Sequence, residues 1–227
     1  MSMNIVTKID DLVKVNTVLI SVSDKSGLET FVPALVSINP NIRILSTGGT
    51  FNRLKEILGK KREANLTQVS QYTGQPETQG GLVKTLDFKI YLGLLTETYN
   101  QDHRDDLKRT AAIPIDMVVV NLYPFQKTVA NPDVTMEQAR GNIDIGGPCM
   151  IRAGAKNFIR VASVVDPADY PDIISELEPL EGMTTLETRS NLARKAFSHT
   201  AQYDTDIADF FLNCPFNKIQ GSYEQIM

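Results

Sequence analysis

The stretch Thr17-Val-Leu-Ile-Ser-Val22 is followed by the polar residues Ser23-Asp-Lys25 and then by an amphipathic run over residues 27–37. A short apolar run that is rich in β-branched residues and bounded by polar ones is typical of a strand buried in a parallel sheet. In the run that follows, Leu28, Phe31 and Leu35 recur at the spacing of one helical face. This stretch therefore predicts a strand, a loop and a helix in succession.

The same alternation continues along the chain. Further strands are predicted over residues 42–45, 66–69, 90–95, 117–121 and 161–165. Further helices are predicted over residues 50–58, 135–141, 148–157, from Pro167 onward, and over 185–212 as one or two helices. Strands that alternate with helices favour an α/β fold of three Rossmann-like layers, with a mostly parallel central sheet flanked by helices and with extra C-terminal helices.

The length and composition narrow the class of protein. A chain of 227 residues can bury one large core, and we expect an N-terminal extension, one domain and a frayed polar tail, over residues 1–15, 16–213 and 214–227. The net charge of −4, without a long cluster of Lys and Arg, argues against a nucleic-acid partner. The sequence contains no run of about 18 apolar residues, so no membrane span is predicted. Residues 1–14 lack the apolar core of a signal peptide, and the expected location is therefore cytoplasmic.

Cysteine usage gives no sign of a metal or disulfide framework. The two cysteines are Cys149, in a Gly-Pro-Cys-Met run, and Cys214, near the C-terminal end of the sequence. Their spacing fits neither a set of disulfides nor a zinc site. We expect both thiols to be structural.

A glycine pair follows the predicted strand over residues 42–45. The segment Ser46-Thr-Gly-Gly-Thr50 combines hydroxyl groups with glycines that let backbone N–H groups approach an anion, just before a predicted helix N-terminus. Ligands of open α/β sheets bind at the carboxyl ends of the strands, where Lys25 also lies. The segment predicts a phosphate cradle, and the alternative is an ordinary tight turn.

The segment Asn142-Ile-Asp-Ile-Gly-Gly147 places a carboxylate, Asp144, between two isoleucines. A carboxylate in apolar surroundings is costly unless it is paired or functional, yet Asp144 is equally well placed to cap the helix that follows. Lys156 lies twelve residues later, near the end of that helix, where a surface role is usual. Lys84, which follows a glycine-rich segment, is equally ambiguous by itself.

Taken together, these segments resemble a known family. The matching motifs are ISVSDKSGL, LSTGGT, VSQYTGQPE, VKTL, VVVNLYPF, NIDIGGPCMIRAGAKN, VVDPADY and AFSHTAQYD. In this order, between Val18 and Ile207, they resemble the IMP cyclohydrolase domain of the bifunctional purine-biosynthesis enzyme that also carries AICAR formyltransferase. That domain has a methylglyoxal-synthase-like fold. The combination of NIDIGG with AKN is specific to it.

The resemblance implies closure of 5-formamidoimidazole-4-carboxamide ribotide (FAICAR) to IMP with loss of water, without a metal or other cofactor. Carried over by motif, the residues implied to hold the ribotide and its phosphate are Ser21, Ser23, Lys25, Ser46, Thr47, Gly48, Gly49 and Thr50. The residues implied to surround the base are Lys84, Thr85, Asn121, Tyr123, Asp144, Ile145, Gly146, Gly147 and Lys156.

The implied chemistry needs acid and base groups. The carboxamide nitrogen is a poor nucleophile, so closure requires a base for its proton, a donor for the formyl oxyanion and an acid for the departing hydroxide. Asp144 with Lys156 suits proton transfer from the amide, and Lys84 suits the oxyanion and the leaving water. Tyr123 would position or relay.

The chain departs from the family pattern beside Lys84. Where the family reads Gly-Arg-Val-Lys-Thr-Leu-His-Pro, this chain has Leu82 for the arginine and Asp87-Phe88 for the His-Pro pair, and Tyr91-Leu92 replaces a following His-Gly pair. A leucine cannot replace the charge and planar hydrogen bonding of a guanidinium. Either the affinity for the ribotide has fallen, or another arginine such as Arg152 or Arg104 replaces the lost guanidinium, or the protein binds a different ligand.

Two other functions stay open at this point. One is a regulatory purine-nucleotide-binding domain of the same fold without turnover, which Leu82 favours and the retained Lys84, Asp144 and Lys156 oppose. The other is methylglyoxal synthase, to which the NIDIGG and AKN segment is foreign. The sequence stops where the formyltransferase domain of the family would begin, so either a separate AICAR formyltransferase is the expected partner or the sequence is one part of a longer protein. A homodimer is compatible with the sequence.

Overall fold

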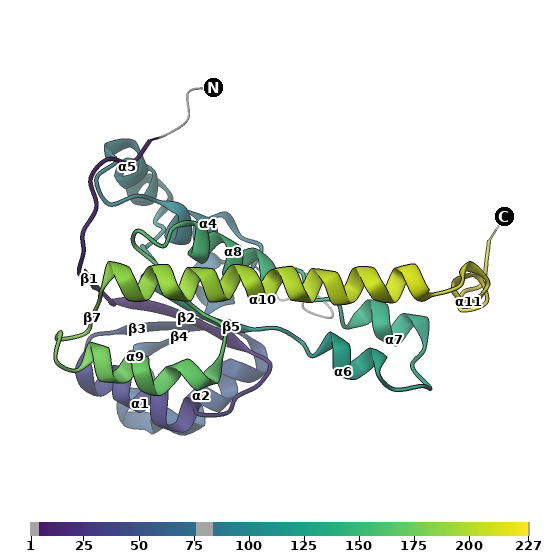
Figure 1. Ribbon diagram of the computed structural model, residues 1–227. Helices are drawn as coiled ribbons and strands as arrows, with labels where there is room; N and C mark the ends of the chain where they lie inside the picture. The colour runs from purple at the N-terminus through teal and green to yellow at the C-terminus, as the bar shows by residue number, and fades with distance from the viewer. Residues whose placement is uncertain (1–4, 76–83, 227) are drawn as a thin grey trace.

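A computed structural model describes residues 5–75 and 84–226 of the chain (Figure 1). Its centre is a five-stranded sheet in which all neighbouring strands are parallel. In spatial order the strands are β4 (Leu66–Gln68), β3 (Arg43–Ser46), β2 (Thr17–Val22), β5 (Met117–Asn121) and β6 (Ala162–Val164). The predicted α/β fold with a parallel sheet is confirmed.

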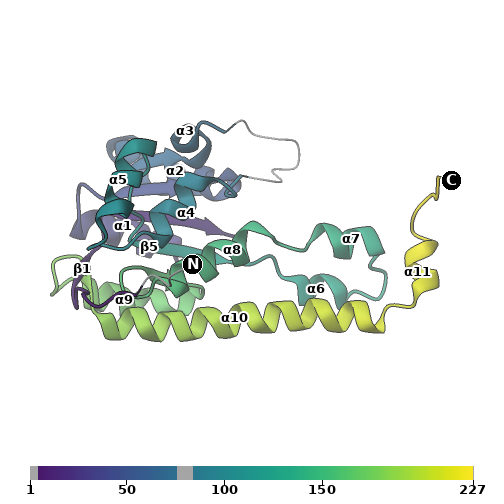
Figure 2. The same cartoon turned by 90° about the horizontal axis from the view of Figure 1, so that it is seen from above.

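Helices cover both faces of this sheet (Figures 1 and 2). One apolar cluster joins Val18 and Ile20 of β2 to helices α1 (Leu28–Ile38), α2 (Gly48–Arg62) and α9 (Tyr170–Leu177). The other joins Leu19 to helices α4 (Phe88–Leu95), α8 (Gly146–Lys156) and α10 (Leu186–Asn213). Successive residues of β2 thus point into opposite layers, which explains why the whole strand is apolar.

The long helix α10 runs past the sheet and forms an arm with the shorter helices beside its C-terminal half (Figures 1 and 2). The arm consists of α6 (Phe125–Val129), α7 (Met136–Gly141), the end of α10 and α11 (Phe216–Gln220). The tail predicted to be frayed therefore contains a helical turn. The other elements are η1 (Glu63–Asn65), α3 (Val69–Thr73), α5 (Gln101–Thr110) and η3 (Pro167–Asp169). Among the described residues, no helix combines the length and apolar character needed to cross a membrane.

The strand predicted over residues 90–95 is wrong, because these residues belong to helix α4. Asp87 caps this helix, since its carboxylate accepts the backbone N–H of Lys89 at 2.8 Å. Ile90, Gly93 and Leu94 form its buried face, which is a helical spacing. A side chain at position 93 would meet the carbonyl oxygen of Ile113 at 2.6 Å, so the glycine permits close packing.

The N-terminal extension is attached to the domain through β1 (Val13–Lys14), which pairs with β7 (Met183–Thr184) in an antiparallel sheet of two strands. Beside this pair lies Arg189 of α10, whose side chain has no exposed surface. Its guanidinium donates hydrogen bonds to the backbone carbonyl oxygens of Asp10, Asp11, Phe158, Ile159 and Thr184. A single side chain thus joins the extension, α10 and the loop before β6.

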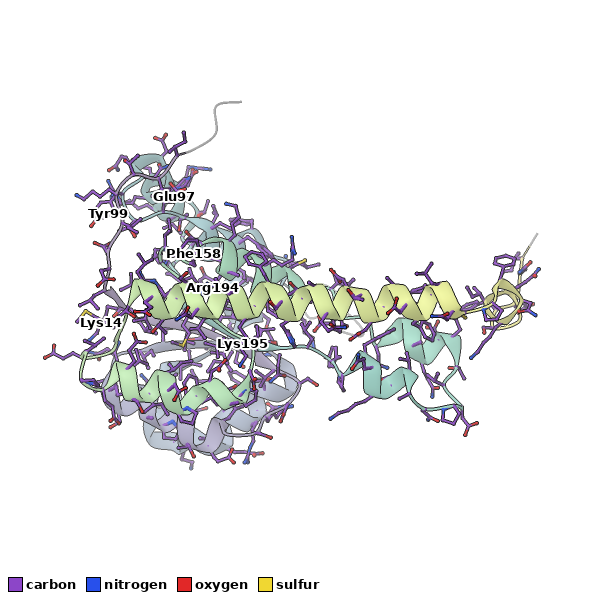
Figure 3. The ribbon with its side chains drawn as sticks, viewed as in Figure 1. Lys14, Glu97, Tyr99, Phe158, Arg194 and Lys195 are labelled. Atoms are coloured by element: carbon purple, nitrogen blue, oxygen red, sulfur yellow. The ribbon has the colours of Figure 1, made fainter. Side chains whose placement is uncertain are left out.

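We predict that Arg189→Met destabilises the fold by at least about 3 kcal/mol, because several buried carbonyl groups lose their donor at once. Urea unfolding followed by circular dichroism measures this change. The matched control is Arg194→Met, since Arg194 extends from the exposed side of the same helix (Figure 3). Equal unfolding midpoints for the two variants would contradict the role given to Arg189.

Candidate active site

The predicted site residues begin where three parallel strands end. The register pairs Ile20 of β2 with Ser46 of β3, and Val22 of β2 with Asn121 of β5. The loops that follow these strands therefore leave the same edge of the sheet side by side. This edge is where open α/β sheets bind ligands.

Hydroxyl groups tie the first two loops together. The Ser21 and Thr47 hydroxyls are 2.9 Å apart. The Thr50 hydroxyl accepts the N–H of Val22 at 3.1 Å and donates to its carbonyl oxygen at 3.0 Å. The Ser46 hydroxyl is fully buried and donates to the carbonyl oxygen of Ile20 at 2.7 Å. Ser46 and Thr50 thus shape the cradle from beneath.

The open surface of this cradle is the start of helix α2. Thr47 and Gly48 are half-buried and Gly49 is exposed, and Thr47 makes no side-chain capping bond to the helix. The first N–H groups of a helix are electropositive and lack intrahelical partners. An anion is the natural acceptor for them.

Asn121 fixes the loop that follows β2. Its amide oxygen accepts the N–H groups of Ser23 and Asp24 at 2.7 and 2.8 Å, and its amide nitrogen donates to the carbonyl oxygen of Asp24 at 2.8 Å. The side chain expected to face the base therefore holds the protein's own backbone. Lys25, half-buried, donates to the carbonyl oxygen of Ser23 at 3.3 Å.

Lys84 and Thr85 connect the cradle to the second half of the site. A Cβ atom on Gly48 would lie 3.4 Å from the Lys84 ammonium, so this cation lies above the glycine turn. The Thr85 hydroxyl would be 2.5 Å from a Cβ atom on Gly146, so it lies against the start of α8. Two adjacent residues thereby touch both glycine-rich segments.

Asp144 lies at the start of helix α8 with its carboxylate directed at backbone N–H groups. One carboxylate oxygen accepts the N–H of Gly147 at 2.9 Å, and the N–H groups of Gly146 and Tyr123 also point to the carboxylate. Burial raises the pKa of this carboxyl above its ordinary value of 3.8, and the N–H donors oppose that shift. Asp144 is thus both a helix-capping group and a carboxylate with perturbed acidity.

The glycine after this acid is a steric requirement. A Cβ atom on Gly147 would be 2.5 Å from a carboxylate oxygen of Asp144 and 2.5 Å from the Leu122 side chain. Real Cβ atoms do not approach other atoms so closely, so any larger residue would displace the carboxylate. Ile145, the residue directly after the acid, is 59% exposed.

Two of the predicted catalytic residues, Tyr123 and Lys156, have side chains in positions that do not match the roles expected from the sequence. Tyr123 is 53% exposed, and it contributes its backbone N–H to Asp144. Lys156 is exposed on the last turn of α8, whereas Asp144 binds the first turn. Ten residues separate Gly146 from Lys156, which is a rise of about 15 Å. The expected pairing of Asp144 with Lys156 is not formed within the chain.

The departures from the family pattern have partial structural explanations. Leu82 lies outside the described residues. Asp87 takes the role of a helix cap for α4. Of the two arginines considered as replacements, Arg104 donates to Thr98 and Gln101, and the Arg152 guanidinium lies over the ring of Phe197 at 5.7 Å. Both guanidinium groups are thus engaged outside the cradle.

One residue at the site was missed by the sequence reasoning. Tyr203 of α10 accepts the backbone N–H of Asp144 at 2.7 Å through its hydroxyl, and it is only 7% exposed. It lies in the motif AFSHTAQYD, to which no role was assigned. The spacing of Ala196, Thr200 and Tyr203, all buried, marks the inner face of the helix and was the available signal.

Comparisons with known proteins agree with the resemblance seen in the sequence. The bifunctional purine biosynthesis protein PurH of Thermoanaerobacter sp. (strain X514) is 48% identical over 211 residues, which make up 91% of this chain and 40% of PurH. The chain thus spans less than half the length of this relative. The crystal structure of ForH is similar with a TM-score of 0.73 and 30% identity, over 86% of this chain and 98% of ForH.

Two family descriptions match adjoining parts of the sequence. Residues 27–149, which include the cradle, Lys84 and Asp144, match the MGS-like domain. Residues 154–226, which include Tyr203, match the AICARFT/IMPCHase bienzyme. The chain therefore belongs to the MGS-like domain family, and its C-terminal segment is similar to the AICARFT/IMPCHase bienzyme.

Proposed function

We propose that this protein is an IMP cyclohydrolase that closes the ring of FAICAR with loss of water, the last step of purine biosynthesis. One observation carries the proposal above all. A carboxylate with a raised pKa, Asp144, and an anion cradle at the start of α2 are joined by the adjacent residues Lys84 and Thr85. A ribotide needs both groups, one for its phosphate and one for its base.

The phosphate would bind at the N-terminus of α2. The N–H groups of Gly48 and Gly49 are the donors, and the Thr47 hydroxyl lies beside them. Lys84, above the glycine turn, and Lys25, in the neighbouring loop after β2, would supply positive charge. The Ser46 hydroxyl bonds to the backbone of β2 and the Asn121 amide to the loop after it, so both side chains hold the shape of the strand ends.

Ring closure forms one bond and breaks another. The carboxamide nitrogen adds to the formyl carbon, and Asp144 accepts the proton that the nitrogen loses. Lys84 stabilises the oxyanion, which becomes a hydroxyl group by taking the proton that Asp144 removed from the carboxamide nitrogen. Lys84 then protonates this hydroxyl group, which leaves as water, and Lys84 regains its proton from the former formamide nitrogen. Both reacting groups belong to one bound molecule, so fixing its conformation contributes to the rate.

The roles that we propose for Tyr123 and Lys156 differ from those expected from the sequence, because of where the two residues lie. Tyr123 would position the carboxylate through its backbone N–H, while its side chain is exposed. Lys156 is left out of the proton transfer within one chain because it lies at the far end of α8. The substrate would come from an AICAR formyltransferase activity, and we propose that the protein works as a homodimer beside it.

The function is tested by following the conversion of FAICAR to IMP by absorbance, beside a titration with IMP on the same sample. Turnover far above the uncatalysed rate would support the cyclohydrolase. Binding of IMP without turnover would favour the regulatory nucleotide-binding domain instead. Formation of methylglyoxal from a triose phosphate would favour the third alternative.

We predict that Lys25→Ala weakens IMP binding about tenfold or more, because a charged hydrogen bond to phosphate is lost. Binding of inosine, which lacks the phosphate, should not change. Calorimetric titration with both ligands measures the difference. Lys60→Ala, at the other end of α2, is the control for the loss of one positive charge. Equal weakening of inosine binding would place Lys25 away from the phosphate.

We predict that Asp144→Asn lowers kcat by about 10²- to 10⁴-fold, the usual contribution of a general base. The asparagine oxygen can still accept the N–H of Gly147, so the site should keep its shape. Steady-state kinetics with FAICAR measures the change. A kcat within twofold of the wild-type value would remove Asp144 from the proton transfer.

The same variant has an expected effect on stability. Since burial raises the folded-state pKa of Asp144, the wild-type protein loses stability as pH rises from 3.8 through the raised value, where the buried group ionises. Asp144→Asn has no charge to bury, so we expect it to be at least as stable as the wild type at neutral pH. Urea unfolding at several pH values from about 4 to 8 checks this sign.

A further inference from the structure

The hydroxyl of Tyr203 makes two hydrogen bonds to the backbone of the short segment that carries Asp144. It accepts the backbone N–H of Asp144 at 2.7 Å and donates to the carbonyl oxygen of Asn142 at 3.3 Å. Between them these bonds clamp the connection from α7 to α8, only four residues long. Tyr203 itself is 59 positions further along the chain from Asp144.

The Tyr203 ring also packs against the first residue of helix α6, Phe125. Phe125 is 1% exposed and meets the ring edge-on, with centroids 6.3 Å apart and planes at 72°. Phe210 of α10 packs in turn on Phe125 at 5.7 Å and 88°. Such edge-to-face pairs fix ring orientation as well as burying area.

These aromatic contacts all lie close to residues that position the carboxylate of Asp144. Phe125 lies two residues after Tyr123, whose backbone N–H donates to Asp144. One aromatic cluster therefore positions both the segment that bears the acid and the loop that supplies one of its donors. Burial also raises the pKa of the Tyr203 phenol, so its hydroxyl remains protonated and can donate and accept at once. The negative charges of Asp144 and Asp204 raise the pKa of this phenol further.

We propose that Tyr203 is a positioning residue of the active site, which sets the place and the acidity of Asp144 from the C-terminal helix. Its role in catalysis rests on the proposed function. Tyr203 is buried behind the Asp144 backbone, so it acts through the acid and not on the substrate. Helix α10 is thereby a part of the catalytic apparatus as well as a cover of the sheet edge.

The test is Tyr203→Phe, which keeps the ring and removes the hydroxyl. The first readout is the pKa of Asp144, measured by ¹³C NMR titration of its carboxyl group, with Asp144→Asn identifying the signal. Because burial is the largest cause of the raised pKa, release of the segment toward solvent should move the pKa down toward 3.8. This measurement needs no substrate.

The second readout is the kinetics with FAICAR. We expect kcat to fall about tenfold or more, because the two hydrogen bonds that hold the Asp144 segment are lost, with KM changed less than about twofold. The acid limb of the pH–rate profile should shift in the same direction as the pKa measured by NMR. Failure of the wild-type protein to close the ring would overturn the proposed function, while the NMR titration would still test the clamp.

The matched control is Tyr170→Phe. Tyr170 is 3% exposed and stacks on Phe31 in the opposite layer, with ring centroids 4.3 Å apart. This substitution removes a buried hydroxyl of the same kind without touching the Asp144 segment. If Tyr203→Phe lowers only the stability, and leaves the Asp144 pKa and kcat at the values of the control, the proposal is overturned.

Discussion

The parallel pairing of β2 with β5 is the constraint on which the site depends. Parallel neighbours need a long crossover, and about a hundred residues of chain separate Val22 from its partner Asn121. The pairing brings two strand ends together, and the Asn121 amide closes the junction with three hydrogen bonds to Ser23 and Asp24. The cradle on one side and Asp144 on the other are both placed relative to this junction.

The two halves of the site are built by different kinds of contact. Around the cradle, residues at adjacent strand ends bond to each other, as Ser21 does to Thr47 and Thr50 to Val22. Around Asp144, the supports come from a loop after β5 and from α10. A change in the C-terminal helix is therefore expected to act on the part of the site that contains Asp144, while the part that contains the glycine turn before α2 is held by the sheet.

The local sequence predicts a strand or a helix correctly where the pattern of apolar residues is compatible with only one of the two. The strands over residues 17–22 and 117–121 agree with the structure because their apolar runs are rich in β-branched residues and buried on both faces. The run over residues 90–95 is equally apolar, but its length fits a strand or one buried helix. Asp87, which caps the helix, decides between them, and in the sequence it appeared only as a departure from a family motif.

For the candidate site too, local sequence predicts local features but not contacts between distant segments. The glycine turns and Asp144 could be predicted because their chemistry is local, whereas the contact of Tyr203 and the distance of Lys156 follow from the paths of whole helices. The capping and the catalytic interpretations of Asp144 also turn out to be compatible. The N–H groups that the carboxylate caps are what hold it in a half-buried place, and burial there is what raises its pKa. Gly147 belongs to the same arrangement, because a side chain at that position would occupy the space of the carboxylate.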